Sequence, residues 1–329
     1  MKFFEEFGEV KVREEIPVPK SDLEKVLDIE EEIIREYERD ERFEQHSKEE
    51  HIGWQLICTT LQEKLADIKI NPELLQGYIN ARENSEENTQ ARIRGMYSAA
   101  LLEIIATKIP ETHTLIDGKG KTFNYLFYHI HNIKNLAIRN IKGNHILGMA
   151  GAFNGSVKIL TLQNITGNNT LAYAGWNGNV THITLQNIRG DNTLYCAGNY
   201  HGSATHITLT NITGDCTLYY AGSYRGSAKN IILQHITGNH TLQLASSNGS
   251  AINITLHNIK GHNTLNHAGE NHGSVTNILQ ENELTKKQKS ILSQIETMVE
   301  NMHTLSSEEQ KAAYDKIAQL QEEIFAGET

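Results

Sequence analysis

Two aspartates are the clearest candidates for acid–base chemistry in this sequence. Asp191 and Asp215 are 24 residues apart, and each directly follows a glycine. If the chain repeats with this period, their carboxyl groups lie about 5 Å apart, near the separation found in retaining glycosidases. Arg189 is close by in sequence. The structural alternative is turn formation, because Gly-Asp and Gly-Asn are ordinary turn pairs. The same repeat position elsewhere holds Asn144, Asn168, Asn239 and His262.

Histidine is concentrated in the middle of the chain, where twelve of the sixteen histidines lie between His129 and His272. His182 and His206 share one repeat position, so their rings could stack or bind one metal ion. Exposed histidines in turns are the ordinary alternative. We therefore expect neither a resident metal nor another cofactor.

A third candidate is an aromatic surface on one flank of the repeats. Its members are Phe153, Trp176, Tyr195, Tyr200, Tyr219 and Tyr224, with His201 and Arg225 beside them. Exposed aromatic side chains spaced by one repeat can stack on sugars or bury a partner's surface. The alternative is that they cover a corner of the core. Later repeats carry Ser247 and Asn271 instead, so the aromatic set is local, which favours binding.

All three candidates depend on a repeat that dominates the middle of the chain. Its markers are six glycines spaced by 24, 23, 24, 24 and 23 residues: Gly143, Gly167, Gly190, Gly214, Gly238 and Gly261. A fixed period of this length indicates stacked structural units. Each unit contains an alternating run, such as ITLQNI at 183–188, and alternation with period two predicts strands. A second short strand is predicted at 193–197, and Gly-rich turns join the two.

Stacking the units puts like residues into columns. One inward column is Ile138, Leu162, Leu185, Leu209, Leu233 and Leu256. Threonines such as Thr208 and Thr193 are predicted to point outward into water. An asparagine column, Asn140, Asn164, Asn187, Asn211 and Asn258 with His235 as the exception, can bond one coil to the next, because an amide both donates and accepts. A leucine-rich repeat is the rival architecture, but the Gly-rich return segments favour β-coils.

The predicted fold is mixed α and β. A parallel β-solenoid of about six 24-residue coils occupies residues 111–280. It follows an N-terminal helical domain at 1–110, in which Ser21 and Glu24 form a capping box. A C-terminal helical hairpin at 281–329 is expected to cover the open end of the solenoid, since a bare strand edge invites aggregation.

Composition narrows the function classes. Residues 111–280 hold ten basic and five acidic residues, which is too few cations for a nucleic-acid groove. No apolar run has the length of a membrane span. Three widely spaced cysteines argue against a disulfide framework. We expect a cytoplasmic protein that binds neither nucleic acid nor membrane.

The start of the repeats resembles a known fold family. The stretches LIDGKGKTF at 115–123 and IKNLAIRNI at 133–141 look like the entry coils of right-handed parallel β-helix proteins of the pectin-lyase-like class. The resemblance covers about residues 115–280 and concerns the fold. That class includes lyases and hydrolases of acidic polysaccharides, phage tailspikes and non-enzymatic adhesins, so fold alone does not choose among them. The paired aspartates, Gly-His-Gly and Arg-x-Lys signature of polygalacturonases, and the Asp-rich calcium cluster of pectate lyases, are absent from the sequence.

The sequence favours a non-enzymatic structural or binding scaffold with a rigid solenoid surface. A protein or glycan is the expected partner, and the helical ends are candidates for self-association. The alternative is a polysaccharide-binding or polysaccharide-degrading β-helix protein. Clustered carboxylates would favour an enzyme, and the repeats contain few of them.

Overall fold

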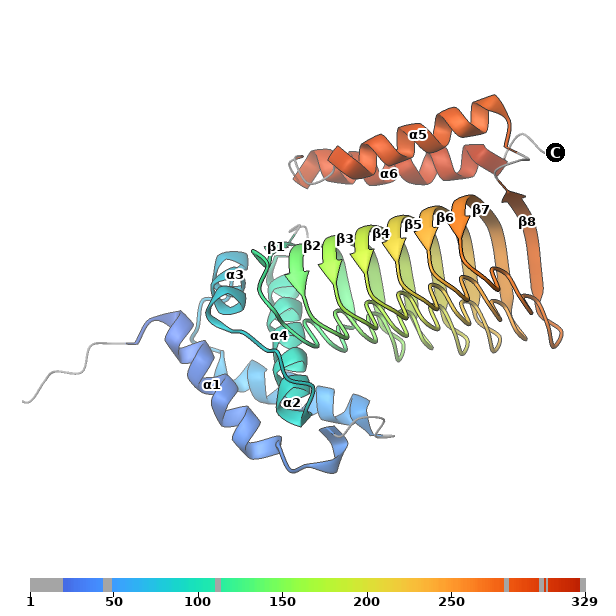
Figure 1. Ribbon diagram of the computed structural model, residues 1–329. Helices are drawn as coiled ribbons and strands as arrows, with labels where there is room; N and C mark the ends of the chain where they lie inside the picture. The colour runs from blue at the N-terminus through green and yellow to red at the C-terminus, as the bar shows by residue number, and fades with distance from the viewer. Residues whose placement is uncertain are drawn as a thin grey trace, which may run out of the picture.

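Eight parallel strands stack in chain order into one sheet, which forms a β-solenoid of about seven coils (Figure 1). The computed structural model describes residues 20–43, 49–109, 114–280, 284–301, 305 and 307–325. The strands are β1 (Thr114–Asp117), β2 (Asn132–Lys142), β3 (Ser156–Thr166), β4 (Asn179–Arg189), β5 (Ser203–Thr213), β6 (Ser227–Thr237), β7 (Ser250–Lys260) and β8 (Ser274–Gln280). The mixed α and β class and the parallel β-helix are therefore confirmed.

The register of the strands follows the sequence repeat. Leu185 pairs with Leu209, which pairs with Leu233, so like residues lie above one another. The side chains of all three are fully buried. Apolar burial is the main force holding such a stack, because each coil covers the apolar residues of its neighbours. The predicted inward columns are confirmed.

The second strand predicted in each coil is wrong. In residues 192–198 every second residue has a positive φ, including Leu194 at 56° and Cys196 at 58°. Successive turns are closed by bonds such as Ala197 N–H to Leu194 O, 3.2 Å. A turn with negative φ at its second residue and positive φ at its third is a type II turn. A chain of such turns also repeats every two residues, so alternation alone could not separate it from a strand.

The N-terminal end of the solenoid is covered by helices. These are α1 (Asp22–Tyr37), α2 (Glu50–Lys64), α3 (Pro72–Ala81) and α4 (Thr89–Lys108), with a short 3-10 helix at Glu41–Phe43. The predicted capping box of Ser21 and Glu24 opens α1. Gln76 of α3 exchanges two hydrogen bonds with the backbone of Asp117 in β1. Gly95 of α4 lies so close to Tyr125 that a Cβ there would meet its carbonyl oxygen at 2.2 Å.

The C-terminal hairpin covers a different surface from the one predicted. Helices α5 (Lys286–Asn301) and α6 (Ser307–Phe325) lie along the outer face of the sheet, and the end coil stays uncovered by them (Figure 1). Gln321 of α6 donates to the hydroxyl of Thr208, 2.7 Å, and Gln234 donates to the carbonyl of Leu292 in α5, 3.4 Å. An apolar cluster that includes Ile232 of β6 fills the interface. The expectation of an end cap is therefore wrong.

Both predicted outward threonine columns are also wrong. Thr208 is fully buried beneath the hairpin. Thr193 is fully buried within the coil and its hydroxyl bonds to the carbonyl of Gly190, 3.4 Å. The hydroxyl is paired in both settings. The Thr193 hydroxyl donates to a local backbone oxygen, and the Thr208 hydroxyl accepts from Gln321 of the hairpin. Alternation identified which residues share a face, but it did not show what covers that face.

Candidate binding surface

The aromatic residues lie on tight turns that close successive coils. In coils of 24 residues both central residues of this turn have positive φ, as at Tyr200 (48°) and His201 (65°). The hydrogen bond from Gly202 N–H to Asn199 O, 3.0 Å, closes a type I′ turn. A 23-residue coil has one residue fewer just before this turn. In such a coil Trp176 and Asn177 are the two central residues of the turn, and only Asn177 has a positive φ. This one-residue difference accounts for the uneven spacing of the glycines.

The turns bring their rings into a continuous row, here called the aromatic flank: Phe153, Trp176, Tyr200 and Tyr224. The first two contacts in the row are edge-to-face, and Tyr200 and Tyr224 are stacked. Ring centroids are 5.2 Å apart from Phe153 to Trp176, 5.4 Å from Trp176 to Tyr200, and 4.9 Å from Tyr200 to Tyr224. Tyr200 is 46% and Tyr224 45% exposed, which is unusual for large aromatic residues. Their companions His201 and Arg225 are exposed as well. These residues therefore lie next to one another, and their role as a binding surface stays a prediction.

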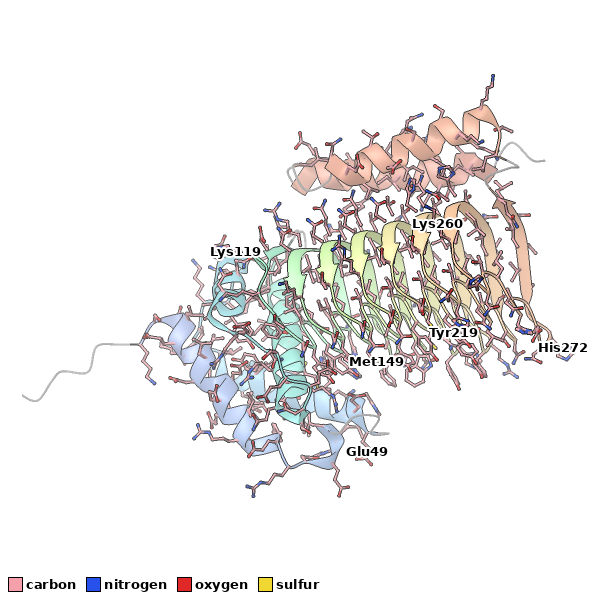
Figure 2. The ribbon with its side chains drawn as sticks, in the orientation of Figure 1. Glu49, Lys119, Met149, Tyr219, Lys260 and His272 are labelled. Carbon is pink, nitrogen blue, oxygen red and sulfur yellow. The ribbon has the colours of Figure 1, made fainter. Side chains whose placement is uncertain are left out.

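A second row of tyrosines runs beside the flank. Tyr195 and Tyr219 stack at 5.6 Å, as their shared repeat position predicted. Tyr173 and Tyr220 join them, at 5.7 Å and 6.1 Å from Tyr195. These two were missed because they occupy the neighbouring repeat position, where the intervening coil has Cys196. Burial raises the pKa of the Tyr195 phenol, so this side chain stays neutral. Figure 2 shows Met149 and Tyr219 on the side of the solenoid away from α5 and α6.

The aromatic flank is anchored to the helical domain at one end. Phe153 stacks on His129 at 5.7 Å and on His51 of α2 at 5.2 Å. His129 is fully buried, with its Nε2 3.7 Å from a carboxylate oxygen of Glu50. Burial pushes the pKa of Glu50 upward, but His129 and Arg92 outweigh it, so the pKa lies below its ordinary value. Phe153 is therefore held in place by buried residues of the helical domain and the first coil, and the exposed part of the flank begins after it.

The side chains of the two aspartates accept hydrogen bonds from the backbone of the next coil. Asp191 Oδ1 accepts the N–H of Asp215, 2.8 Å, and Asp215 Oδ1 accepts the N–H of Asn239, 2.7 Å. Asn168 Oδ1 accepts the N–H of Asp191 one coil earlier, 2.9 Å, and Asn144 Oδ1 accepts the N–H of Asn168 two coils earlier, 2.7 Å. The structural role proposed for this column thus accounts for one oxygen of each carboxylate. Catalysis by Asp191, Asp215 and Arg189 stays an untested hypothesis.

His182 and His206 stack as their shared position predicted, with centroids 4.7 Å apart. His206 Nδ1 is 3.1 Å from the side-chain oxygen of Gln321 in α6, so one ring bonds to the hairpin. Burial, with His206 nearby, lowers the pKa of His182. Within the described ranges, no group of three or more His, Cys, Asp or Glu side chains is arranged to hold a metal ion.

A polar groove follows the asparagine column along five coils. Hydrogen bonds between side-chain amides connect the coils: Asn164 donates to Asn140, and Asn187 donates to Asn164, both at 3.0 Å. The groove encloses about 640 Å³, and its lining is Asn164, Thr166, Asn187, Arg189, Asn211, Thr213, His235, Thr237, Asn258 and Lys260. It borders α5, because His235 Nε2 is 3.4 Å from Glu296. The sequence indicated the ladder but not the groove beside it.

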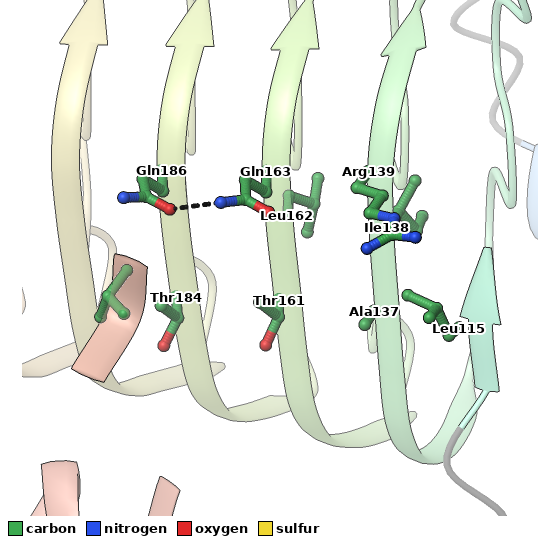
Figure 3. Close-up of a pocket in the computed structure, with 10 residues that line it drawn as sticks. Leu115, Ala137, Ile138, Arg139, Thr161, Leu162, Gln163, Thr184 and Gln186 are labelled. Atoms are coloured by element: carbon green, nitrogen blue, oxygen red, sulfur yellow. Dashed lines mark hydrogen bonds between the residues drawn. The ribbon is translucent and has the colours of Figure 1, made fainter. Parts of the chain in front are cut away.

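A cavity between the sheet and α5 is too small for a ligand (Figure 3). It holds about 20 Å³ between Thr161, Thr184 and Val299. That space admits about one water molecule. Gln163 donates to Gln186 across its wall, 2.7 Å, so the polar groups there are already paired (Figure 3).

A pocket of about 250 Å³ lies between α2 and α4, next to Trp54, Cys58 and Glu103. Glu103 joins the helical domain to the solenoid, since its Oε1 accepts the backbone N–H groups of His131 and Asn132. Burial raises the pKa of Glu103 from 4.5 to about 7. Burial raises the pKa of the Cys58 thiol too, which makes it a poor nucleophile.

We expect Glu103→Gln to change how stability depends on pH. The folded protein holds the Glu103 proton more tightly than the unfolded chain, so the stability this gives is complete below pH 4.5 and is lost as the pH rises through about 7. The glutamine keeps an oxygen for the two N–H groups but does not titrate. The free energy of unfolding of the variant, relative to the original protein, should therefore rise between pH 4.5 and 7 and then level.

Urea titrations at several pH values measure this difference. His131, whose pKa burial lowers to about 4, gives the opposite slope, but it is present in both proteins and drops out of the comparison. A difference that does not vary with pH would show that Glu103 titrates normally.

Comparison of the chain with protein-family models, with curated proteins and with solved structures finds no match. Within the described residues, no helix is both long enough and apolar enough to cross a bilayer. The function must therefore be argued from the surfaces described above.

Proposed function

We propose that this protein is a non-enzymatic binding scaffold that holds a partner on the aromatic flank. The observation that carries the proposal is the continuous row of rings in contact, the last two of which are stacked on each other and almost half exposed. Tyrosine and tryptophan are common anchors of binding surfaces, because they offer large apolar faces with little side-chain freedom to lose. A rigid row spaced by about 5 Å suits a partner with a regular surface.

The absence of aromatics from later coils supports a binding role over a structural one. The equivalent turns carry Ser247 and Asn271, and these coils close with the same hydrogen-bonded turns. The solenoid can therefore be built without rings at this position. The scaffold is stiff, because every coil is paired in register with the next.

The test is a variant with Trp176→Ala, Tyr200→Ala and Tyr224→Ala. We expect it to keep the circular dichroism of the original protein and to lose the partner that the original protein captures from native lysate or on a glycan array. The matched control is Thr166→Ala, Thr213→Ala and Thr237→Ala, three exposed positions in the polar groove. Unfolding of the aromatic variant alone would mean that the rings cover the core.

A polysaccharide ligand is the second candidate, favoured by the polar groove. The groove offers amide and hydroxyl groups at one set per coil, together with Arg189 and Lys260. A glycan array with a reducing-sugar assay separates binding from degradation. Binding that is lost in the threonine control variant and kept in the aromatic variant would favour this candidate.

A further inference from the structure

In the part of the chain that the structure describes, the C-terminal end of the solenoid has no covering segment. β8 is the last strand of the sheet, and no described segment lies against its outer edge (Figure 1). An edge strand presents unpaired N–H and C=O groups. The hairpin leaves them exposed because it lies along the face of the sheet.

The last coil also leaves its apolar residues half covered. Leu242 and Ile254 are fully buried, whereas Leu265 and Ile278, at the same positions one coil later, are only partly buried. Val275 is partly buried where Ala251 is fully buried. The missing cover is the next coil of the stack.

The edge lacks the features that normally keep such strands apart. β8 has the sequence SVTNILQ, without a charge or a proline. Exposed edge strands of monomeric proteins usually carry lysine, proline or a bulge. Glu270 is the single Asp, Glu, Lys or Arg in residues 261–280. Two copies of this end would therefore meet without strong like-charge repulsion.

The other end of the solenoid cannot supply the missing coil. Helices α3 and α4 pack against β1 and β2, and Asn84 forms a bridge to Phe123 in the first coil. A head-to-tail filament would require an open N-terminal end. The remaining way to bury this end on another copy is to join the C-terminal ends of two solenoids about a two-fold axis. Such an assembly is complete with two subunits.

We propose that two copies of this protein dimerise tail to tail through their β8 edges. The strands meet antiparallel, and the partner covers Val275, Leu265 and Ile278. Asn277 suits this contact: its amide donates inward to Asn253, 2.9 Å, which leaves its side-chain oxygen as an acceptor toward the partner. The contact is separate from the helical ends that the sequence pointed to. It also places two aromatic flanks in one particle.

Light scattering after gel filtration tests the dimer on the full chain. We expect the original protein at micromolar concentration to have twice the mass of the 37.0 kDa chain. Ser274→Lys with Thr276→Lys changes two exposed residues of β8, and Lys229 shows that the Thr276 column accepts lysine. This double variant should be monomeric at the same concentration, because antiparallel pairing brings four added charges together.

Thr213→Lys with Thr237→Lys is the matched control. It adds the same charge at exposed positions in a column that already contains Arg189 and Lys260, so it should stay dimeric. A Thr276→Cys variant should crosslink to its own copy through the added thiol on oxidation, since the two strands lie near the axis. A monomeric original protein, or a dimer that survives the edge variant, would overturn the proposal.

Discussion

Leu209→Ala is expected to lower the free energy of unfolding by about 2–5 kcal/mol, as for other large-to-small changes in packed cores. Leu209 is fully buried and stacks in register between Leu185 and Leu233. The neighbouring coils are joined by backbone ladders on both sides, so they cannot collapse into the space left behind. Denaturation by urea, followed by circular dichroism, measures the change.

The matched control for this substitution is Thr213→Ala. Thr213 ends the same strand and is exposed, so its loss should change stability by less than about 0.5 kcal/mol. Thr208 is unsuitable as a control because it is buried and bonded to Gln321. Similar losses at Leu209 and Thr213 would show that the inward and outward faces are assigned incorrectly.

Gly190→Ala is expected to lower the free energy of unfolding by about 2–4 kcal/mol. Its φ is +149°, and a Cβ there would lie 2.1 Å from the carbonyl oxygen of Gly167 in the coil below. Strained backbone and forced overlap of atoms contribute about 1 kcal/mol and about 1–3 kcal/mol respectively. The obstructing atom belongs to the backbone, so a change of rotamer cannot relieve the contact. Thermal and urea unfolding would both report the loss.

Gly120→Ala separates the two contributions to that loss. Gly120 also has a positive φ, +78°, but no atom lies within 4 Å of a Cβ built there. Its substitution should cost about 1 kcal/mol, from the backbone alone. If Gly190→Ala costs no more than this, then the glycines of successive coils are not stacked in contact.

The coil core was predictable from the sequence because it depends on a strict repeat. Positions such as Leu185 and Leu209 keep one residue type through many coils, and stacking in register is the arrangement that buries all of them. The asparagine ladder was predictable for the same reason, since its side-chain hydrogen bonds join equivalent positions of successive coils, with His235 taking the place of one asparagine. In both cases the residues that contact a side chain occupy the same repeat position in the adjacent coils.

The features that were missed depend on contacts outside the repeat. Helices α5 and α6 carry apolar stripes that fit any apolar surface, and the sequence did not distinguish the coil end from the sheet face. Ile232 was a clue, because it replaces threonine in the column that the hairpin covers. The row of type II turns was hidden for another reason: leucine in the left-handed region is rare, so Leu194 suggested a strand.

The arrangement of the aromatic flank could be predicted from the sequence in part. The spacing of Trp176, Tyr200 and Tyr224 predicted that the rings align. The structure adds the edge-to-face contact of the first two, the stacking of the last two and the exposure of the last two. The identity of the partner depends on chemistry outside the chain. Stability and binding must therefore be measured on the same variant.

The most direct test of a binding flank uses the two exposed rings alone. A variant with Tyr200→Ala and Tyr224→Ala should melt within a few degrees of the original protein, because neither ring is buried in the core. Its Kd for the partner captured by the original protein should rise by about 30-fold or more, as expected when hot-spot residues are removed. An unchanged Kd, or a large fall in melting temperature with no specific loss of binding, would contradict the account.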